Sequence, residues 1–379
     1  MVTVLIAGGG TGGHVFPMLA VGEALRRVAP GTEVFYVGTS RGLEARAVPA
    51  AGEELELLDV APLRGGGLSG FAKGLAKAFG SLPAARALVK RKRPDVVLSV
   101  GGYAGGPVAL AARLMGVPLA ILEPNSTLGL TNKLLAPLAR RAYVAFGDLD
   151  RRFGPEIGAR YGVPLRRSFE ATDYVPEAGR FRVLVLGGSQ GAQGLNDAMP
   201  GAIAQLSRSV PEVEVLHQAG RGRDEAVRAA YASLGLDAKA RVLDFVTDVG
   251  GELARADVVV QRAGASSLAE LCLVGRASIL VPFPFAADDH QAKNAQSLEA
   301  VGAAIALPQR EATSEQLAAL LGELAADPAR RLSMARAARA AATPTAADDV
   351  ARDLVALAGS GAALRGNSRG DSAKSERQV

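Results

Sequence analysis

The sequence predicts an α/β protein built from two doubly wound units, each a parallel sheet with helices on both faces. Short apolar, β-branched runs alternate with helix-like stretches along most of the 379 residues, a pattern typical of parallel sheets. A chain of this length is too long for one ordinary core, so two domains are expected. The opening "VTVLIAGGGTGG" is repeated in outline by "FRVLVLGGSQGA" from residue 181. This internal duplication indicates two similar units in tandem.

The expected strands fall into two sets. The first half contains TVLIAG, EVFYVG, DVVLSVG, PLAILE and AYVAF, and the second contains RVLVLGG, EVLHQAG, RVLDFV, DVVVQ, ASILVPF and AAIAL. The segment "RYGVPLRRS", near residues 160–170, separates them. We therefore expect a first domain at 1–163, a second at 164–345 and a helix at 346–358 that returns to the first domain. The polar, aperiodic residues 359–379 are expected to be a disordered tail.

Composition narrows the class of partner. A formal net charge of +5 and a pI near 9.5 indicate an acidic partner. Only 4% of the residues are aromatic and none is Trp, which argues against nucleic acid. A phosphorylated substrate or an anionic membrane surface fits equally well. No apolar stretch is long enough to span a membrane, and the first residues read as a strand, so no signal peptide is expected.

Metal and disulfide chemistry are not expected from the composition. The single cysteine, Cys272, lies in the apolar run "SLAELCLVG" and is expected to be a buried thiol in a reducing compartment. One cysteine and three histidines make a structural zinc site improbable.

The first glycine turn, "GGGTGGHVFP" at residues 8–17, joins a strand to a helix. Missing side chains let the backbone N–H groups and the positive end of the helix approach an anion. Gly8, Gly10 and Gly13 also satisfy the dinucleotide fingerprint. The next strand, however, ends in Val37-Gly38-Thr39, without the acidic residue that would bind the ribose hydroxyls. A nicotinamide cofactor is therefore disfavoured.

The second glycine turn fits G-x-S-x-G, the nucleophile elbow of α/β-hydrolases. Asp257 and His290 could complete a triad with Ser189. This interpretation leaves the first unit unexplained, and no H-G-G-G-type loop precedes the serine, so a hydrolase is disfavoured. The D-x-D sequence at Asp148 to Asp150 resembles the metal clamp of some sugar-nucleotide enzymes, but we interpret it as a turn or helix start.

Several other polar motifs follow predicted strands. They are SVGGYAGGP (99–107), ILEPN (121–125), QRAGASSLAEL (261–271) and VPFPFAADDHQAKNA (281–295). Ligands of such sheets bind at the carboxyl ends of the strands. Polar groups at so many strand ends, from both units, predict one cleft between two domains.

Six blocks together resemble the bacterial peptidoglycan N-acetylglucosaminyltransferases of glycosyltransferase family 28: GGGTGGHVFPMLAV, GGYAGGPVALAA, LEPN, GGSQGAQGLN, RAGASSLAEL and PFPFAADDHQAKNA. The resemblance covers roughly residues 2–358. It implies a GT-B fold, in which two Rossmann-like domains face each other across a cleft. It also implies inverting transfer of GlcNAc from UDP-GlcNAc to the MurNAc 4-hydroxyl of undecaprenyl-pyrophosphoryl-MurNAc-pentapeptide (lipid I), giving lipid II and UDP without an essential metal or other cofactor.

The acceptor hydroxyl needs a base, and we expect His14 to serve, with Glu123 as the competing candidate. His14 lies where the glycine turn becomes a helix, and an unperturbed imidazole pKa near 6.5 suits general-base work. The alternative for His14 is a hydrogen bond to the diphosphate or to the loop itself.

The resemblance also implies a set of donor-binding residues. Ser189 and nearby amides would hold the diphosphate, Glu270 the ribose, the main chain near Val246 the uracil, and Gln291 and Asn125 the sugar. Arg166 would bind the nucleotide or a phosphate. Helix capping and solvated surface positions are the alternatives for these side chains. Thr11, Gly12 and Gly13 would form the bed on which either the acceptor's pyrophosphate or the donor lies. The full expected set is Thr11, Gly12, Gly13, Asn125, Arg166, Ser189, Gln190, Gly191, Val246, Glu270 and Gln291.

A membrane-binding segment is expected because the acceptor is a lipid. Its apolar residues Phe71, Leu75, Phe79 and Leu82 are at helical spacing and are flanked by Lys73 and Lys77, and Lys90 to Arg93 follow. A basic amphipathic helix can lie in an anionic interface; ordinary packing on the sheet is the alternative. We expect a peripheral protein on the cytoplasmic side of the cell membrane. Its partners would be UDP-GlcNAc, lipid I, the anionic inner leaflet and cell-wall synthesis or division proteins.

Two other functions remain open from the sequence. One is another GT-B enzyme, such as a glycolipid transferase or a UDP-sugar epimerase. The other is a non-catalytic sensor of sugar nucleotides.

Overall fold

The computed structural model describes residues 1–60, 80–146, 149–188 and 191–359. The chain divides into two units, one of residues 1–166 with the chain from 344 onward, the other of residues 167–343. Each unit contains one sheet, of seven and six strands respectively, and every strand pair is parallel. The predicted α/β fold class, with two doubly wound units, is confirmed.

The sheet of the first unit has the order β3-β2-β1-β4-β5-β6-β7. The chain order reverses between β1 and β4, and ligands of such sheets bind beyond the carboxyl ends of the strands at this reversal. Its strands are β1 (Thr3–Ala7), β2 (Glu33–Gly38), β3 (Leu55–Leu57), β4 (Val96–Ser99), β5 (Leu119–Glu123), β6 (Arg141–Val144) and β7 (Gly158–Arg160). Its helices are α1 (Gly12–Val28), α2 (Glu44–Ala50), α4 (Leu82–Lys92), α5 (Gly102–Leu114) and α6 (Leu130–Leu135).

The sheet of the second unit has the order β10-β9-β8-β11-β12-β13, and it reverses between β8 and β11. All six predicted strands are present. They are β8 (Phe181–Leu186), β9 (Val213–Gln218), β10 (Ala240–Leu243), β11 (Val258–Gln261), β12 (Ala277–Leu280) and β13 (Ala304–Ala306). The helices are α7 (Gln193–Leu206), α8 (Asp224–Ser233), α9 (Val249–Arg255), α10 (Ala265–Val274), α11 (His290–Ala300), α12 (Ser314–Ala326) and α13 (Pro328–Ala340).

Helices cover both faces of the first sheet. Successive strand residues point to opposite faces, so each strand contributes side chains to two cores. In β1, Val4 and Ile6 belong to a core shared with α1, whereas Leu5 and Ala7 belong to a core shared with α4 and α5. Such continuous apolar strands are typical of parallel sheets covered by helices on both faces.

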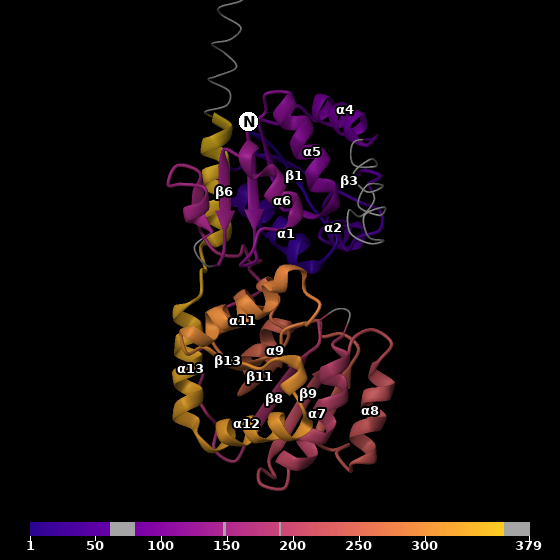
Figure 1. Ribbon diagram of the computed structural model, residues 1–379, viewed down its shortest axis with the longest axis vertical. Coiled ribbons are helices and arrows are strands. Elements are labelled where there is room, and N and C mark those ends of the chain that lie inside the picture. Colours follow the sequence, from indigo (N-terminus) through magenta and orange to yellow (C-terminus); the bar gives the residue numbers. More distant parts are fainter. Residues whose placement is uncertain (61–79, 147–148, 189–190, 360–379) are drawn as a thin grey trace, which may run out of the picture. The chain divides into compact units, whose positions relative to one another are not determined.

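The helix at 346–359 returns to the first unit and packs beside β6 (Figure 1). Val350 and Leu354 are buried in the same core as α1. The carboxylate of Asp353 accepts hydrogen bonds from the Tyr143 hydroxyl at 2.8 Å and from Nε of Arg141 at 3.1 Å. Apolar burial and these two bonds together fix the helix. Of the expected tail, residues 360–379 lie outside the described part of the chain.

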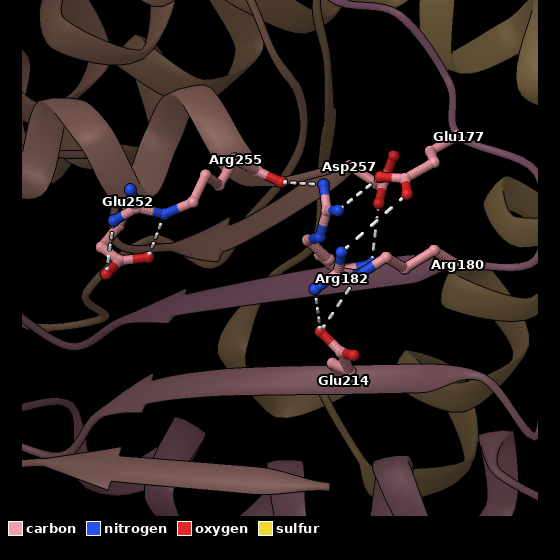
Figure 2. A network of polar contacts seen from close by, with 7 residues as sticks. All are labelled: Glu177, Arg180, Arg182, Glu214, Glu252, Arg255 and Asp257. Carbon is pink, nitrogen blue, oxygen red and sulfur yellow. Dashed lines mark hydrogen bonds and ion pairs between the residues drawn. The ribbon is translucent and has the colours of Figure 1, made fainter.

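A charged network occupies the amino edge of the second sheet (Figure 2). Arg180 pairs with Glu214 at 3.2 Å, and Arg182 pairs with Glu177. Asp257 accepts a hydrogen bond from the Arg182 backbone N–H at 2.7 Å. The network lies at the edge opposite the glycine turn, because β8 begins at the network and ends at the turn.

Candidate functional site

The first glycine turn lies between β1 and α1, as predicted. Gly9 and Gly10 have φ values of +149° and +98°, a region that favours glycine. Thr11 is the extended N-cap of α1, and its carbonyl accepts hydrogen bonds from the N–H groups of His14 and Val15, both at 3.1 Å. The first turn of α1 contains no acidic side chain. The amides of Gly12 and Gly13 thus stand at the positive end of a 17-residue helix.

A second glycine pair, Gly101 and Gly102, packs directly against this turn. A Cβ atom on Gly102 would lie 2.3 Å from the Gly9 carbonyl oxygen, and one on Gly101 would lie 3.3 Å from Nε2 of His14. Both glycines have positive φ, +86° and +74°. The sequence suggested that "SVGGYAGGP" lines a ligand. The structure shows that its first two glycines permit close backbone packing, which places the His14 ring beside them.

Glu123 ends β5 with its side chain 1% exposed. Its Oε1 accepts hydrogen bonds from the backbone and side-chain nitrogens of Asn125, both at 3.1 Å. Its Oε2 accepts from the Gly129 N–H at 2.8 Å and from Nδ2 of Asn132 at 3.1 Å. The carboxylate therefore organises residues 124–132. This geometry favours a positioning role, and its role as a base stays a prediction.

Arg166 lies in the first unit, at the end of the segment that follows β7. Its exposed guanidinium stacks over the Phe16 ring, with Cζ 4.8 Å from the ring centroid. Phe16 belongs to α1 and lies against Gly12, where a Cβ would be 3.0 Å from the Phe16 ring. Arg166 is thus a cation beside the first glycine turn, and its contact with the donor stays a prediction.

The second glycine turn joins β8 to α7. Gly187 N–H donates to the Gln218 carbonyl at 3.2 Å, and Gly191 N–H donates to the Gly188 carbonyl at 3.0 Å. A Cβ on Gly191 would lie 2.2 Å from the Ala219 oxygen, so only glycine fits there. Ser189 and Gln190 lie outside the described residues.

The other predicted donor residues follow the carboxyl ends of strands in the same sheet. Val246 has a buried side chain and lies between β10 and α9. Glu270 is half-buried on α10, which follows β11. Gln291 lies in the first turn of α11, where its Oε1 accepts a hydrogen bond from the Phe283 N–H at 3.0 Å. Donor contacts for these three residues stay predictions.

The hydrolase alternative fails on geometry. Asp257 immediately precedes β11 and is held at the amino edge of the sheet by the Tyr174 hydroxyl at 2.8 Å and the Arg182 N–H at 2.7 Å. The helix that begins at His290 instead follows the carboxyl end of β12. Asp257 therefore cannot orient His290 as a triad requires, and Ser189 lies outside the described residues.

Two residues outside the candidate site resolve earlier alternatives. Asp150 starts a short 3-10 helix, Asp150–Arg152, as the helix-start interpretation of D-x-D predicts; Asp148 is outside the described residues.

Cys272 is buried, and burial raises the pKa of its thiol to about 12. Among the residues with described positions, no group of three or more His, Cys, Asp or Glu side chains could hold a metal ion.

The expected membrane segment is described only at its end. Phe71, Lys73, Leu75, Lys77 and Phe79 lie outside the described residues. Leu82, the first residue of α4, is half-buried and packs against the apolar core. No helix in the described ranges combines the length and apolar character needed to cross a bilayer.

The basic end of α4 is partly engaged within the unit. Arg91 and Lys92 both pair with Glu56 at 2.8 Å. The hydrogen bond from Lys92 lowers the pKa of the Glu56 carboxyl. Lys92 also lies 4.0 Å from the centroid of the Phe35 ring. Of the basic residues 90–93, these two therefore also have a structural role.

Sequence reasoning missed Glu44, a fully buried acid that contacts the first glycine turn. The dinucleotide fingerprint places a ribose-binding carboxylate at the end of β2. Glu44 comes six residues after Gly38. The sequence feature that could have indicated Glu44 is the pair Gly38 and Gly42, since these two glycines lie shortly before it in the chain.

Comparison with known proteins gives consistent matches along the chain. Residues 4–144 match the glycosyltransferase family 28 N-terminal domain, and residues 182–350 match the family's C-terminal domain. A UDP-N-acetylglucosamine–N-acetylmuramyl-(pentapeptide) pyrophosphoryl-undecaprenol N-acetylglucosamine transferase from Sorangium cellulosum is 60% identical over 94% of this chain and 89% of its own. Its namesake from Myxococcus xanthus is 44% identical, covering 94% and 93%. The crystal structure of Acinetobacter baumannii MurG superposes with a TM-score of 0.77 at 32% identity, covering 93% and 99%.

Proposed function

Because this chain belongs to glycosyltransferase family 28, we propose that it transfers N-acetylglucosamine from UDP-N-acetylglucosamine to N-acetylmuramyl-(pentapeptide) pyrophosphoryl-undecaprenol, the lipid I of peptidoglycan synthesis. The observation that carries this proposal is the high identity, over nearly the whole chain, to the Sorangium transferase of that name. The two parallel-sheet units and the match to MurG support it.

The reaction sets two chemical tasks. The 4-hydroxyl of the N-acetylmuramyl residue forms a bond to the anomeric carbon of the donor sugar, while the bond from that carbon to the β-phosphate oxygen breaks. The hydroxyl proton passes to a base, and UDP departs with the bonding electron pair. Attack opposite the leaving group inverts the anomeric centre. The protein must therefore supply a proton acceptor and stabilise charge on the departing diphosphate.

We assign the proton acceptor to His14. Its position in the first turn of α1, beside Gly101, supports this assignment. Glu123 is the weaker candidate, because its carboxylate accepts four hydrogen bonds from its own loop. We expect Glu123 to hold Asn125 ready for a sugar, and the amides of Thr11, Gly12 and Gly13 to receive a pyrophosphate. A cation at Arg166 would add to the attraction.

We assign UDP-GlcNAc to the carboxyl edge of the second sheet. The glycine turn with Ser189, Gln190 and Gly191 would hold the diphosphate at the start of α7. Glu270 would accept hydrogen bonds from the ribose, the main chain near Val246 would meet the uracil, and Gln291 would contact the sugar. All of these positions follow strands of one sheet, which supports a single donor site.

We propose that the diphosphate is neutralised by backbone amides and helix dipoles, so that no metal is needed. Amides fixed before the reaction can stabilise developing charge without reorganisation. Turnover measured in excess chelator should equal turnover in added magnesium. Loss of activity on chelation, restored by the metal, would contradict this part of the proposal.

We also propose that the protein acts as a peripheral protein at the cytoplasmic face of the membrane. The lipid acceptor, the net charge of +5 and the basic end of α4 support this. Anionic lipids attract such cationic surfaces.

The direct test incubates the purified full chain with radiolabelled UDP-GlcNAc and a short-chain lipid I analogue. We expect a labelled disaccharide lipid and free UDP in equal amounts, and no product without the acceptor. Free epimerised sugar would instead identify an epimerase. Binding of UDP-GlcNAc without turnover would identify a sensor.

A further inference from the structure

Glu44 is a buried carboxylate enclosed by three glycines from three different segments. Its side chain is 0% exposed. A Cβ on Gly9 would lie 2.3 Å from the Glu44 Cδ, one on Gly38 would lie 2.4 Å from its Cγ, and one on Gly42 would lie 2.0 Å from its Oε2. Any side chain at these positions would displace the carboxylate. The first glycine turn, the end of β2 and the loop before α2 thus leave space that the Glu44 side chain fills.

The carboxylate binds the glycine turn directly. Its Oε2 accepts a hydrogen bond from the Gly10 N–H at 2.7 Å. Its Oε1 accepts from the N–H of Thr39 at 2.9 Å and from the Thr39 hydroxyl at 2.8 Å. In addition, the Leu43 N–H donates to the Gly10 carbonyl at 3.2 Å. Both peptide groups of Gly10 are therefore held by the segment 43–44.

Burial of this charge needs compensation. A buried carboxylate is strongly disfavoured unless it is paired or fully hydrogen-bonded. Within the part of the chain that the structure describes, no basic side chain forms an ion pair with Glu44. Three hydrogen-bond donors therefore carry the compensation, and one of them is the amide of Gly10. Charge-assisted bonds of this kind are short and stronger than neutral ones.

We propose that Glu44 is a positioning residue, which holds the turn of Gly8 to Gly13 in the conformation that receives the acceptor's pyrophosphate. This inference rests on the proposed function. Gly10 has a φ of +98°, and the direction of its peptide sets that of the amides that follow at the start of α1. Glu44 acts through these amides and does not itself meet the substrate.

The primary test is Glu44→Gln in the full chain. Glutamine keeps the shape but replaces one oxygen by an N–H₂ group, so either Gly10 or Thr39 presents its N–H to another donor. We expect the acceptor KM to rise about tenfold, because one charge-assisted hydrogen bond to the turn is lost. The KM for UDP-GlcNAc should stay within about twofold. Glu53→Gln is the matched control, because Glu53 pairs with Arg26 on the surface of the same unit. Its kinetic constants should stay unchanged.

A second variant displaces the carboxylate without altering it. Gly42→Ala would place a Cβ 2.0 Å from Oε2, whereas Gly322→Ala, inside α12, would meet only Cδ1 of Leu206 at 3.9 Å. We expect Gly42→Ala to raise the acceptor KM as Glu44→Gln does, and Gly322→Ala to leave it unchanged. This pair keeps the test valid if Glu44→Gln does not fold.

Hydrogen exchange at the Gly10 amide gives a readout that does not depend on activity. We expect exchange at Gly10 to accelerate about tenfold in Glu44→Gln and Gly42→Ala, and to stay at the wild-type rate in the two controls. Unchanged exchange with an unchanged acceptor KM would overturn the proposal. An acceptor KM that falls would also overturn it, because the carboxylate would then act only by repelling the anion. If the wild-type chain transfers no sugar, the proposed function fails, and the exchange measurement still decides whether Glu44 holds the turn.

Discussion

Asn196 joins His217 to the second glycine turn. Its Oδ1 lies 3.1 Å from Nε2 of His217, and its Nδ2 donates to the Ala219 carbonyl at 3.0 Å. The same carbonyl oxygen would lie 2.2 Å from a Cβ on Gly191. Nδ1 of His217 lies 3.1 Å from the Tyr231 hydroxyl. A fully buried histidine thus supports the backbone that closes the predicted diphosphate turn.

This arrangement predicts loss of stability in mild acid. Burial lowers the pKa of His217 from 6.5 to about 4, so between these pH values the unfolded chain binds a proton that the native chain does not. The stabilisation is complete above pH 6.5 and is lost as the pH falls toward 4. From pH 7 to pH 5 the free energy of unfolding should fall by about 2 kcal/mol through this residue. Urea unfolding followed by circular dichroism measures it.

The control for this prediction is a second histidine. His217→Gln should remove that part of the pH dependence, whereas His290→Gln, at the partly exposed start of α11, should retain it. Equal slopes in the wild type and His217→Gln would show that His217 does not cause the acid sensitivity.

The contact between Gly102 and the first glycine turn predicts that two glycine-to-alanine substitutions in α5 have opposite effects on stability. Gly102→Ala would put a Cβ 2.3 Å from the Gly9 oxygen at a φ of +74°, so it should destabilise the chain by about 2–4 kcal/mol. Gly106→Ala would meet only Cγ2 of Thr131 at 3.6 Å. Because Gly106 lies inside α5, alanine there should be neutral or stabilise by up to about 1 kcal/mol. Calorimetric unfolding of both variants tests this, and similar melting temperatures would contradict it.

The two parallel-sheet units and most of their strands could be predicted because apolar β-branched runs and glycine turns mark buried strands directly. The strands β3 and β7 were missed, because their sequences, LEL and GAR, contain no β-branched residue and form no apolar run. At the site, the positions of His14 and Glu123 followed from the turn and the strand end. The contacts of Gly102 with Gly9, and of Glu44 with Gly10, join segments far apart in sequence. No local pattern encodes such packing, so these contacts required the structure.

Substitution of the two candidate bases should separate their roles. His14→Gln should lower kcat about a hundredfold or more and remove the acidic limb of the pH–rate profile, because it removes the proton acceptor. Glu123→Gln should raise KM and lower stability, because its four donors lose one accepting oxygen. It should retain the acidic limb. The opposite result, an acidic limb lost only in Glu123→Gln, would assign the base to Glu123.

Membrane binding should depend on the apolar residues that precede α4. Phe71→Asp combined with Phe79→Asp should reduce co-sedimentation with vesicles containing phosphatidylglycerol about tenfold or more, because burial of the two rings in the interface is lost. Leu114→Asp is the control, since Leu114 is an exposed apolar residue on another helix of the unit. Turnover of a short-chain, water-soluble acceptor should be unaffected, which separates membrane binding from catalysis. Unchanged co-sedimentation of the double variant would show that another surface binds the membrane. Binding that falls equally with Leu114→Asp would show that the effect is general to the unit.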